Sequence, residues 1–93
     1  MGIQTDTTTI HIRLMLFASL RELAGHSEER LALSGPQSVG SVRALLAARG
    51  DRWSNLLLDS TRVRAALNQQ LANEQTTLSD GDELAFFPPV TGG

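Results

Sequence analysis

The 93-residue sequence contains no cysteine and no lysine. Without thiols the chain cannot form disulfides, thiolate zinc sites, iron–sulfur clusters or a cysteine nucleophile, which excludes a small electron-transfer protein. Without lysine it has no internal ε-amine to form a Schiff base or to accept an isopeptide bond. If the chain takes part in protein conjugation, it must therefore act as the donor.

A strong charge of one sign and long apolar runs are also missing. The formal net charge is −2, so no excess positive field is available to displace counterions from nucleic acid. No apolar run approaches the ~18 residues of a spanning helix, and the opening residues lack the basic-then-apolar order of a signal peptide. We therefore expect a cytoplasmic protein that binds neither nucleic acid nor membranes.

The remaining composition, with 41% hydrophobic and 19% charged residues, suits one small domain with a single core. Residues 1–9 are polar and lack apolar periodicity, which predicts a flexible N-terminal tail. We place the folded domain at residues 10–87 and an extended C-terminal tail at residues 88–93.

Alternating apolar positions predict the strands of this domain. The predicted strands cover residues 10–17, 29–34, 63–68 and 83–87, with a further short strand around Leu71. A turn at residues 79–82 launches the last strand. Pro88 and Pro89 end that strand, because a proline has no N–H to donate to a neighbouring strand.

Helical spacing and capping residues predict three helices. Ser19 and Glu22 form a capping-box pattern, and Gly25 suits the left-handed end of a short helix. Ser38 is expected to cap the main helix, predicted over residues 39–49, and Asp51 to cap a brief helix that follows. The apolar residues expected on the core face of the main helix are Val39, Val42, Leu45 and Leu46.

This order of elements predicts an α+β roll, with a mixed sheet, one main helix packed on one face, and the first and last strands side by side. Met15, Phe17, Ala85 and Phe87 then point away from the helix and form an exposed apolar patch. Such a patch on a small protein favours a partner surface, and the alternative is that loops fold over it.

Side chains that could hold a metal or act in catalysis form no recognised constellation in the sequence. His11 and His26 lack a nearby cysteine or a helical i,i+4 partner, and the acidic cluster at residues 80–83 lacks calcium-loop spacing. No phosphate-binding glycine motif or nucleophile elbow is present. We expect no metal site, no permanently bound cofactor and no catalytic side chain within the folded domain.

The most informative stretch is the ending Phe86-Phe87-Pro88-Pro89-Val90-Thr91-Gly92-Gly93. The two prolines stiffen the exit from the last strand, and six residues in extended form span up to ~20 Å. The last two glycines carry no Cβ, so they fit a channel too narrow for any side chain. We interpret the tail as an arm that delivers the terminal carboxylate into another protein, with a frayed terminus as the alternative.

This ending resembles the ThiS/MoaD family of ubiquitin-like sulfur carriers, which includes the small subunits of molybdopterin synthase. Four further stretches carry the resemblance: Arg21-Glu22-Leu23, Asp51-Arg52-Trp53, Asn68-Gln69 and Asp80-Gly81-Asp82-Glu83. It spans residues 10–93, and residues 1–9 depart from it as an extension. A bare Gly-Gly ending is shared by ubiquitin-like carriers, whereas Phe-Phe-Pro-Pro before it is typical of the molybdopterin branch. The resemblance implies a β-grasp fold, in agreement with the α+β roll.

The resemblance also implies a chemistry, with Gly93 and its neighbour Gly92 as the reactive residues. An E1-like, MoeB-type adenylyltransferase would use ATP to convert the Gly93 carboxylate into an acyl-adenylate. A sulfur donor such as a desulfurase or rhodanese would then leave a terminal thiocarboxylate. In a MoaE-like large subunit, two successive carriers would give their sulfur to cyclic pyranopterin monophosphate and form the molybdopterin dithiolene.

The implied assembly is a heterotetramer of two small and two large subunits, with the catalytic side chains in the large subunit. Phe17, Leu71 and Phe87 occupy positions where the family places its apolar contact with that subunit. The residues of the inserted tail would be Pro88, Pro89, Val90, Thr91, Gly92 and Gly93.

Two other functions remain open at the level of sequence. The same activated tail would suit a carrier for thiamin thiazole synthesis or a ubiquitin-like protein modifier, although Phe-Phe-Pro-Pro favours molybdopterin synthesis. A β-grasp module that docks RNA or protein without taking part in chemistry is the further alternative.

Overall fold

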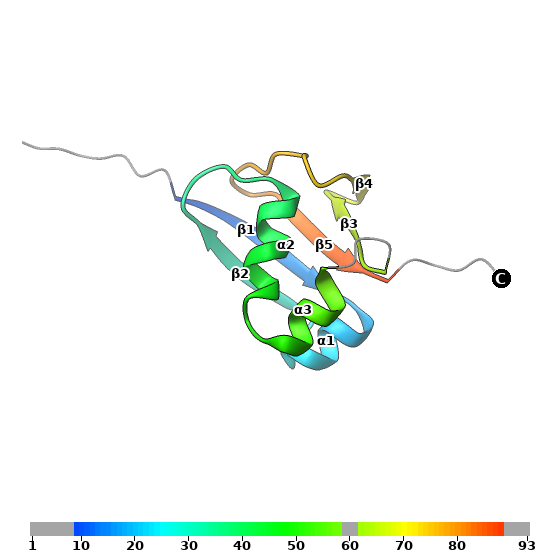
Figure 1. Ribbon diagram of the computed structural model, residues 1–93. Helices are drawn as coiled ribbons and strands as arrows, with labels where there is room; N and C mark the ends of the chain where they lie inside the picture. The colour runs from blue at the N-terminus through cyan, green and yellow to red at the C-terminus, as the bar shows by residue number, and fades with distance from the viewer. Residues whose placement is uncertain (1–8, 59–61, 89–93) are drawn as a thin grey trace, which may run out of the picture.

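The computed structural model describes residues 9–58 and 62–88. The predicted tails at residues 1–9 and 88–93 lie almost wholly outside this range, so their extended character stays a prediction. The described residues form five strands and three helices (Figure 1). In chain order these are β1 (Ile10–Leu16), α1 (Ala18–Ala24), β2 (Glu28–Leu33), α2 (Val39–Ala47), α3 (Asp51–Leu57), β3 (Arg64–Leu67), β4 (Gln70–Ala72) and β5 (Glu83–Phe87).

The strands form one mixed sheet in the order β2-β1-β5-β3-β4. β1 pairs antiparallel with β2 and parallel with β5, so the first and last strands lie side by side as predicted. β3 pairs antiparallel with both β5 and β4. The last strand is therefore held on both sides in the middle of the sheet, and its end is firmly positioned.

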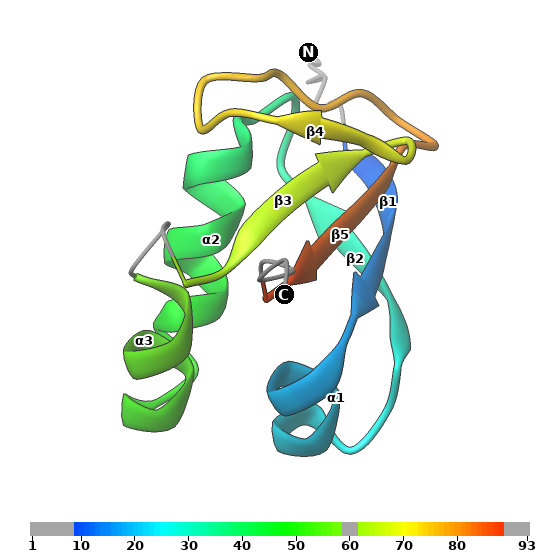
Figure 2. The same cartoon turned by 90° about the vertical axis from the view of Figure 1, so that its right-hand side faces the viewer.

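The helices lie on one side of this sheet. α2 crosses one face, while α1 and α3 lie beyond one end of the strands (Figures 1 and 2). In the described part of the chain no helix covers the opposite face (Figure 2). The strand residues buried against the helix layer include Ile10, Ile12, Leu14, Leu16, Leu84 and Phe86, which confirms the predicted parity.

The main helix begins at Val39 as predicted, but it ends at Ala47, two residues before the predicted end, and one of its apolar positions was assigned wrongly. Ser38 caps it, since its side-chain oxygen accepts a hydrogen bond from the Ser41 N–H at 3.1 Å. Val39, Val42 and Leu46 are fully buried, but Leu45 is 45% exposed, so its assignment to the core was wrong. At 100° per residue, Leu45 lies about a quarter of a turn away from the mean direction of the other three.

The other two helices begin differently from the sequence prediction. Phe17 is the N-cap of α1, and its carbonyl accepts the Leu20 N–H at 3.1 Å. Ser19 lies inside the first turn, so the capping box predicted for it is wrong. Asp51 is the first residue of α3 and does not cap it, because Gly50 takes the N-cap position. The Asp51 carboxylate still lies at the positive end of the helix dipole.

A buried arginine joins the helix layer to the sheet. Arg43 of α2 is 5% exposed, and its Nε and Nη2 donate to the Glu74 carboxylate at 2.9 and 3.0 Å. Its Nη1 donates to the Leu57 carbonyl at 2.7 Å, and its guanidinium lies 5.2 Å from the ring centroid of Phe86. The buried charge is thus fully hydrogen-bonded, and it fixes β5 relative to both α2 and α3.

Candidate functional site

The uncovered face of the sheet carries a continuous apolar row. Met15 of β1 is the register partner of Ala85 in β5, and Ala85 is the partner of Ala66 in β3. Ala66 in turn pairs with Leu71 of β4. Since directly paired residues on neighbouring strands share one face, these four side chains cross the sheet in line. Leu71, which only the resemblance placed in a partner contact, therefore lies on the predicted patch.

Met15, Ala66 and Ala85 of this row line a broad groove of about 880 Å³, which Phe17, Phe87 and Pro88 extend toward the end of β5. Leu71 lies on the same face but outside the lining of the groove. Phe17 is 44% exposed and Leu71 is 71% exposed, while Met15 and Phe87 are half-buried. Ala85 belongs to this face but is only 8% exposed, so its predicted exposure was wrong. Its short side chain lies between longer neighbours and forms the floor of the groove.

The strand that carries the predicted reactive tail ends at this groove. Phe87 is the last residue of β5, and Pro88 follows as an exposed residue that lines the groove. The predicted site residues Pro89, Val90, Thr91, Gly92 and Gly93 lie outside the described residues. What the structure places together is thus the predicted docking residues Phe17, Leu71 and Phe87 and the start of the tail.

The turn that precedes β5 uses its carboxylates in structural hydrogen bonds. Asp80 Oδ1 accepts the His11 N–H at 2.8 Å, and Asp82 Oδ2 accepts the Ser79 N–H at 2.8 Å. Asn68 donates to Asp82 Oδ1 at 3.1 Å and accepts the Glu83 N–H at 3.0 Å. These bonds explain the acidic cluster and the Asn68 motif, since both hold the start of β5 in place.

The second histidine belongs to a charged network at the far edge of the sheet. His26 Nε2 lies 2.7 Å from Glu29 Oε1, and the Arg49 guanidinium donates to both carboxylate oxygens of Glu29. The hydrogen bond from Arg49 lowers the pKa of Glu29 below its ordinary value, partial burial opposes this shift, and His26 adds to it. Sequence spacing does not reveal this network, because its members come from β2, the turn after α2 and the turn before β2.

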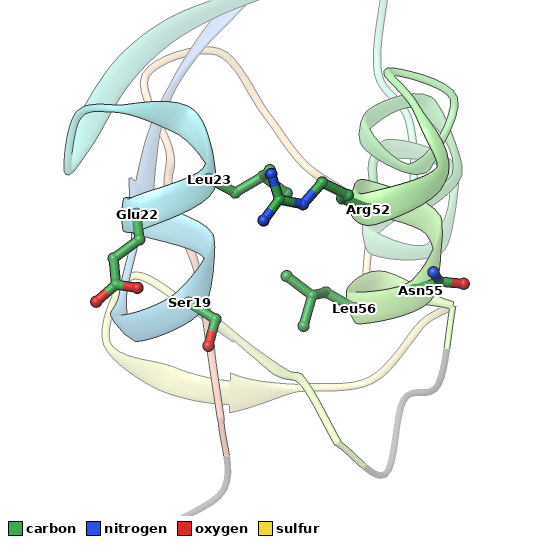
Figure 3. Close-up of a pocket in the computed structure, with 6 residues that line it drawn as sticks. All are labelled: Ser19, Glu22, Leu23, Arg52, Asn55 and Leu56. Carbon is green, nitrogen blue, oxygen red and sulfur yellow. The ribbon is translucent and has the colours of Figure 1, made fainter.

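A second hollow, of about 460 Å³, lies between α1 and α3 (Figure 3). Leu23, Arg52 and Leu56 reach into it, whereas the Glu22 carboxylate points away from Arg52 (Figure 3). Two of the stretches that carry the family resemblance meet here, but the hollow lies on the helix side of the molecule. It shares Ser19 and Leu56 with a smaller cleft that Pro88 also lines, but it shares no lining residue with the groove on the open face.

The fold and the position of the tail define a class of protein. A mixed five-stranded sheet with a helix across one face is the ubiquitin-like β-grasp fold, and here its last strand leads into a Gly-Gly ending. The model of the ThiS family matches residues 14–93, and the chain belongs to that family. Within the described residues, no helix combines the length and apolar character that a membrane crossing requires.

Individual relatives are consistent with this assignment. The molybdopterin synthase sulfur carrier subunit of Escherichia coli is 45% identical over 82 residues, which cover 88% of this chain and 99% of that relative. Small archaeal modifier protein 1 of Haloferax volcanii is 36% identical over 83 residues, covering 84% and 95%. Its crystal structure superposes with a TM-score of 0.66 at 34% identity, over 87% of this chain and 99% of that one.

One similar structure is a complex. A chain in the protein complex of subunits 1 and 2 of molybdopterin-converting factor from Helicobacter pylori superposes with a TM-score of 0.59. Its sequence identity is 26%, over 90% of this chain and 100% of that one. The β-grasp fold predicted from the sequence is thereby confirmed.

Proposed function

We propose that this chain is the sulfur carrier subunit of a molybdopterin synthase, with the Gly93 carboxylate as its reactive group. The observation that carries the proposal is the position of β5. This central strand, paired on both sides, ends beside an exposed apolar groove and continues into the sequence Pro-Pro-Val-Thr-Gly-Gly. The relative in Escherichia coli, similar over nearly its whole length, is named for this function.

The proposed activation makes an inert carboxylate reactive in two balanced steps. A carboxylate oxygen of Gly93 attacks the α-phosphorus of ATP in an E1-like, MoeB-type adenylyltransferase, which forms the acyl-adenylate and releases pyrophosphate. Sulfide then attacks the carbonyl carbon. Where the persulfide of a desulfurase or rhodanese attacks instead, the product is an acyl disulfide, and a thiol must reduce its S–S bond to release the donor. The bond to AMP breaks as the carbon–sulfur bond forms, and the chain ends in a thiocarboxylate. This sulfur replaces the thiol nucleophile that the cysteine-free sequence lacks.

The transfer step is assigned to a MoaE-like large subunit in a heterotetramer with two copies of each chain. Five residues follow Pro88, so the extended tail reaches up to about 17 Å beyond it. This distance takes the sulfur away from the side chains of the folded domain. The acid–base groups that act on cyclic pyranopterin monophosphate therefore belong to the partner, and the groove supplies the docking surface.

Intact-mass spectrometry tests the activation directly. The full chain is incubated with the adenylyltransferase, ATP and sulfide, and we expect the mass to rise by the difference between sulfur and oxygen. A matched sample without ATP should keep its mass. Adding the large subunit and cyclic pyranopterin monophosphate to the loaded chain should return the original mass as molybdopterin forms. An unchanged mass in the complete mixture would refute the carrier function.

A ubiquitin-like modifier is the second candidate, because small archaeal modifier protein 1 is similar in both sequence and fold. The two functions differ in the acceptor of the activated carbonyl. A modifier would form an isopeptide bond with a lysine of another protein, and the product would be a larger, covalently joined species. We expect no such species when the activated chain is mixed with lysine-rich protein extract, whereas its appearance would favour the modifier.

A further inference from the structure

Two hollows meet where β5 ends. The groove on the open face and a smaller cleft of about 240 Å³ share Phe17 and Pro88 in their linings. Arg21 lines the groove, and Arg62 lines the cleft. Pro88, the first residue of the tail, therefore lies between two surfaces that each carry an arginine.

A third arginine lies beside the same strand end. Arg64 of β3 is exposed and is the register partner of Phe87, which places it on the open face next to the last residue of β5. We call Arg21, Arg62 and Arg64 the exit arginines. They come from α1, from the segment before β3 and from β3 itself, so three separate parts of the chain bring positive charge to the tail exit.

The positive charge of Arg21 and Arg62 has little compensation within the groove and the cleft, whereas Arg64 lines a separate hollow that also holds Glu74. Glu83 is the one acidic residue among the described residues that line the groove and the cleft, and it is paired with Arg13 at 3.0 Å. Among the residues that the structure describes, the exit arginines form no ion pair. The whole chain nevertheless has a net charge of −2. The exit is thus a locally basic site on an acidic protein.

We propose that the exit arginines pair with carboxylates around the mouth of the channel in which the large subunit receives the tail. This inference rests on the proposed function. An anionic group at the reacting carbon is the other ligand to consider, but five residues follow Pro88, so Gly93 can reach up to about 17 Å beyond it. The exit arginines therefore act at the rim of the interface, around the apolar contact of Phe17 and Phe87.

Arginine suits this role because its planar guanidinium binds a carboxylate through two parallel hydrogen bonds. Charges at the rim of an interface mainly accelerate association, and added salt screens their effect. The expected signature is therefore a loss of affinity that is large at low ionic strength and small at high ionic strength. A purely apolar contact would not produce this dependence.

The experiment compares three charge reversals in binding to the purified large subunit: Arg21→Glu, Arg64→Glu and the control Arg52→Glu. Arg52 is exposed on α3 and lines neither the groove nor the cleft, and its reversal changes the net charge equally. At low salt we expect the two exit variants to bind about tenfold more weakly than the wild type, and the control to bind normally. In about 1 M salt the loss should largely disappear, since the Debye length falls to about 3 Å.

Urea denaturation confirms that each variant is folded, and Arg64→Gln provides a milder change should a reversal unfold the domain. Equal affinities of the exit variants and Arg52→Glu, or a loss independent of salt, would overturn the proposal. The sulfur-loading assay separates this result from failure of the proposed function. A wild-type chain that acquires sulfur and binds the large subunit leaves that function intact even if the exit arginines prove irrelevant.

Discussion

Phe87 belongs both to the proposed docking groove and to the end of the strand that leads into the tail. It is half-buried at the end of β5, on the face opposite the core, and the neighbouring Phe86 is fully buried beneath the helices. Because β5 is paired on both sides, the backbone of Phe87 is held in place, and its side chain lines the groove beside Pro88. An aromatic side chain that is already ordered loses little entropy when a partner covers it.

Phe87→Ala should therefore weaken binding to the large subunit while leaving the domain folded. Buried aromatic anchors contribute about 2 kcal/mol or more, which corresponds to roughly 30-fold in affinity. Phe87→Glu should have a larger effect, because it places a carboxylate in the apolar contact. Isothermal titration calorimetry measures both variants. Leu45→Ala, at an exposed leucine on the helix side, serves as the control, and equal affinities of all variants would argue against the open face as the docking surface.

The ionisation of the Glu29 carboxyl affects the free energy of unfolding, because its pKa is lowered in the folded protein. Its pKa lies below the ordinary value of 4.5 in the folded protein, mainly because Arg49 donates hydrogen bonds to its carboxylate. A group with a lowered folded pKa stabilises the fold above its unfolded pKa, and this contribution is lost as the pH falls through the folded value. The Arg49 guanidinium also lies 4.9 Å from the Trp53 ring centroid, so the pair joins β2 to α3 and to the turn that follows α2.

Glu29→Gln should therefore lower the free energy of unfolding at neutral pH. The difference from the wild type should shrink as the pH is taken from about 7 to below about 4. Urea denaturation at a series of pH values gives this difference. Glu22→Gln, at an exposed glutamate that forms no ion pair within the described residues, should show little pH-dependent difference. A difference that stays constant across the series would contradict the assignment.

Among the elements, the β3–β4 turn carries the clearest backbone strain. Asn68 and Gln69 have φ angles of 50° and 71°, the left-handed region that favours asparagine and glycine. Gln69 also lines the open-face groove. Gln69→Gly should raise the free energy of unfolding by about 1 kcal/mol, measured by urea denaturation, because glycine adopts this conformation without strain. Gln70→Gly, inside β4, should instead destabilise the domain, and a destabilised Gln69→Gly would refute the argument.

The sequence was most informative where local turn and proline signals mark both ends of an element. The last strand, Glu83–Phe87, was predicted to the residue, because a strong turn precedes it and prolines follow. The starts of α1 and α3 were wrong, since two residues near each start could serve as the cap. In the structure α1 begins directly after β1, so Phe17 and not Ser19 occupies the N-cap position. The position of this helix start depends on the path of the chain in three dimensions.

The candidate site was predictable only in part for a similar reason. Strand parity placed Met15, Phe17 and Phe87 on one face, because alternation is a local property. Arg64 and Ala66 lie on the same face because they pair with Phe87 and Ala85 of β5. Sequence spacing does not reveal the register between β3 and β5. One local signal was overlooked. Arg43, four residues after Val39, interrupts the apolar stripe of α2, and a charge at such a position indicates a buried ion pair.

At the scale of the whole molecule, the proposal assigns docking and reactivity to separate parts. The groove and its exit arginines belong to the folded domain, whereas the reacting carboxylate lies up to about 17 Å beyond Pro88. Each contact of the open face is made without the last residue. Binding to the large subunit and transfer of sulfur should consequently respond to different changes in the chain.

Deletion of Gly93 should therefore abolish sulfur transfer and leave complex formation nearly intact. The shortened chain ends in Gly92, so its carboxylate stops about 3.5 Å short of the reacting position. Misplacement on this scale is enough to stop a reaction that depends on alignment. Size-exclusion chromatography with the large subunit measures binding, and molybdopterin formation measures transfer.

Phe87→Glu is the reciprocal variant. It should bind the large subunit weakly but still acquire sulfur at its intact terminus. Loss of both binding and transfer on removal of Gly93 would show that the last residue is itself part of the docking contact.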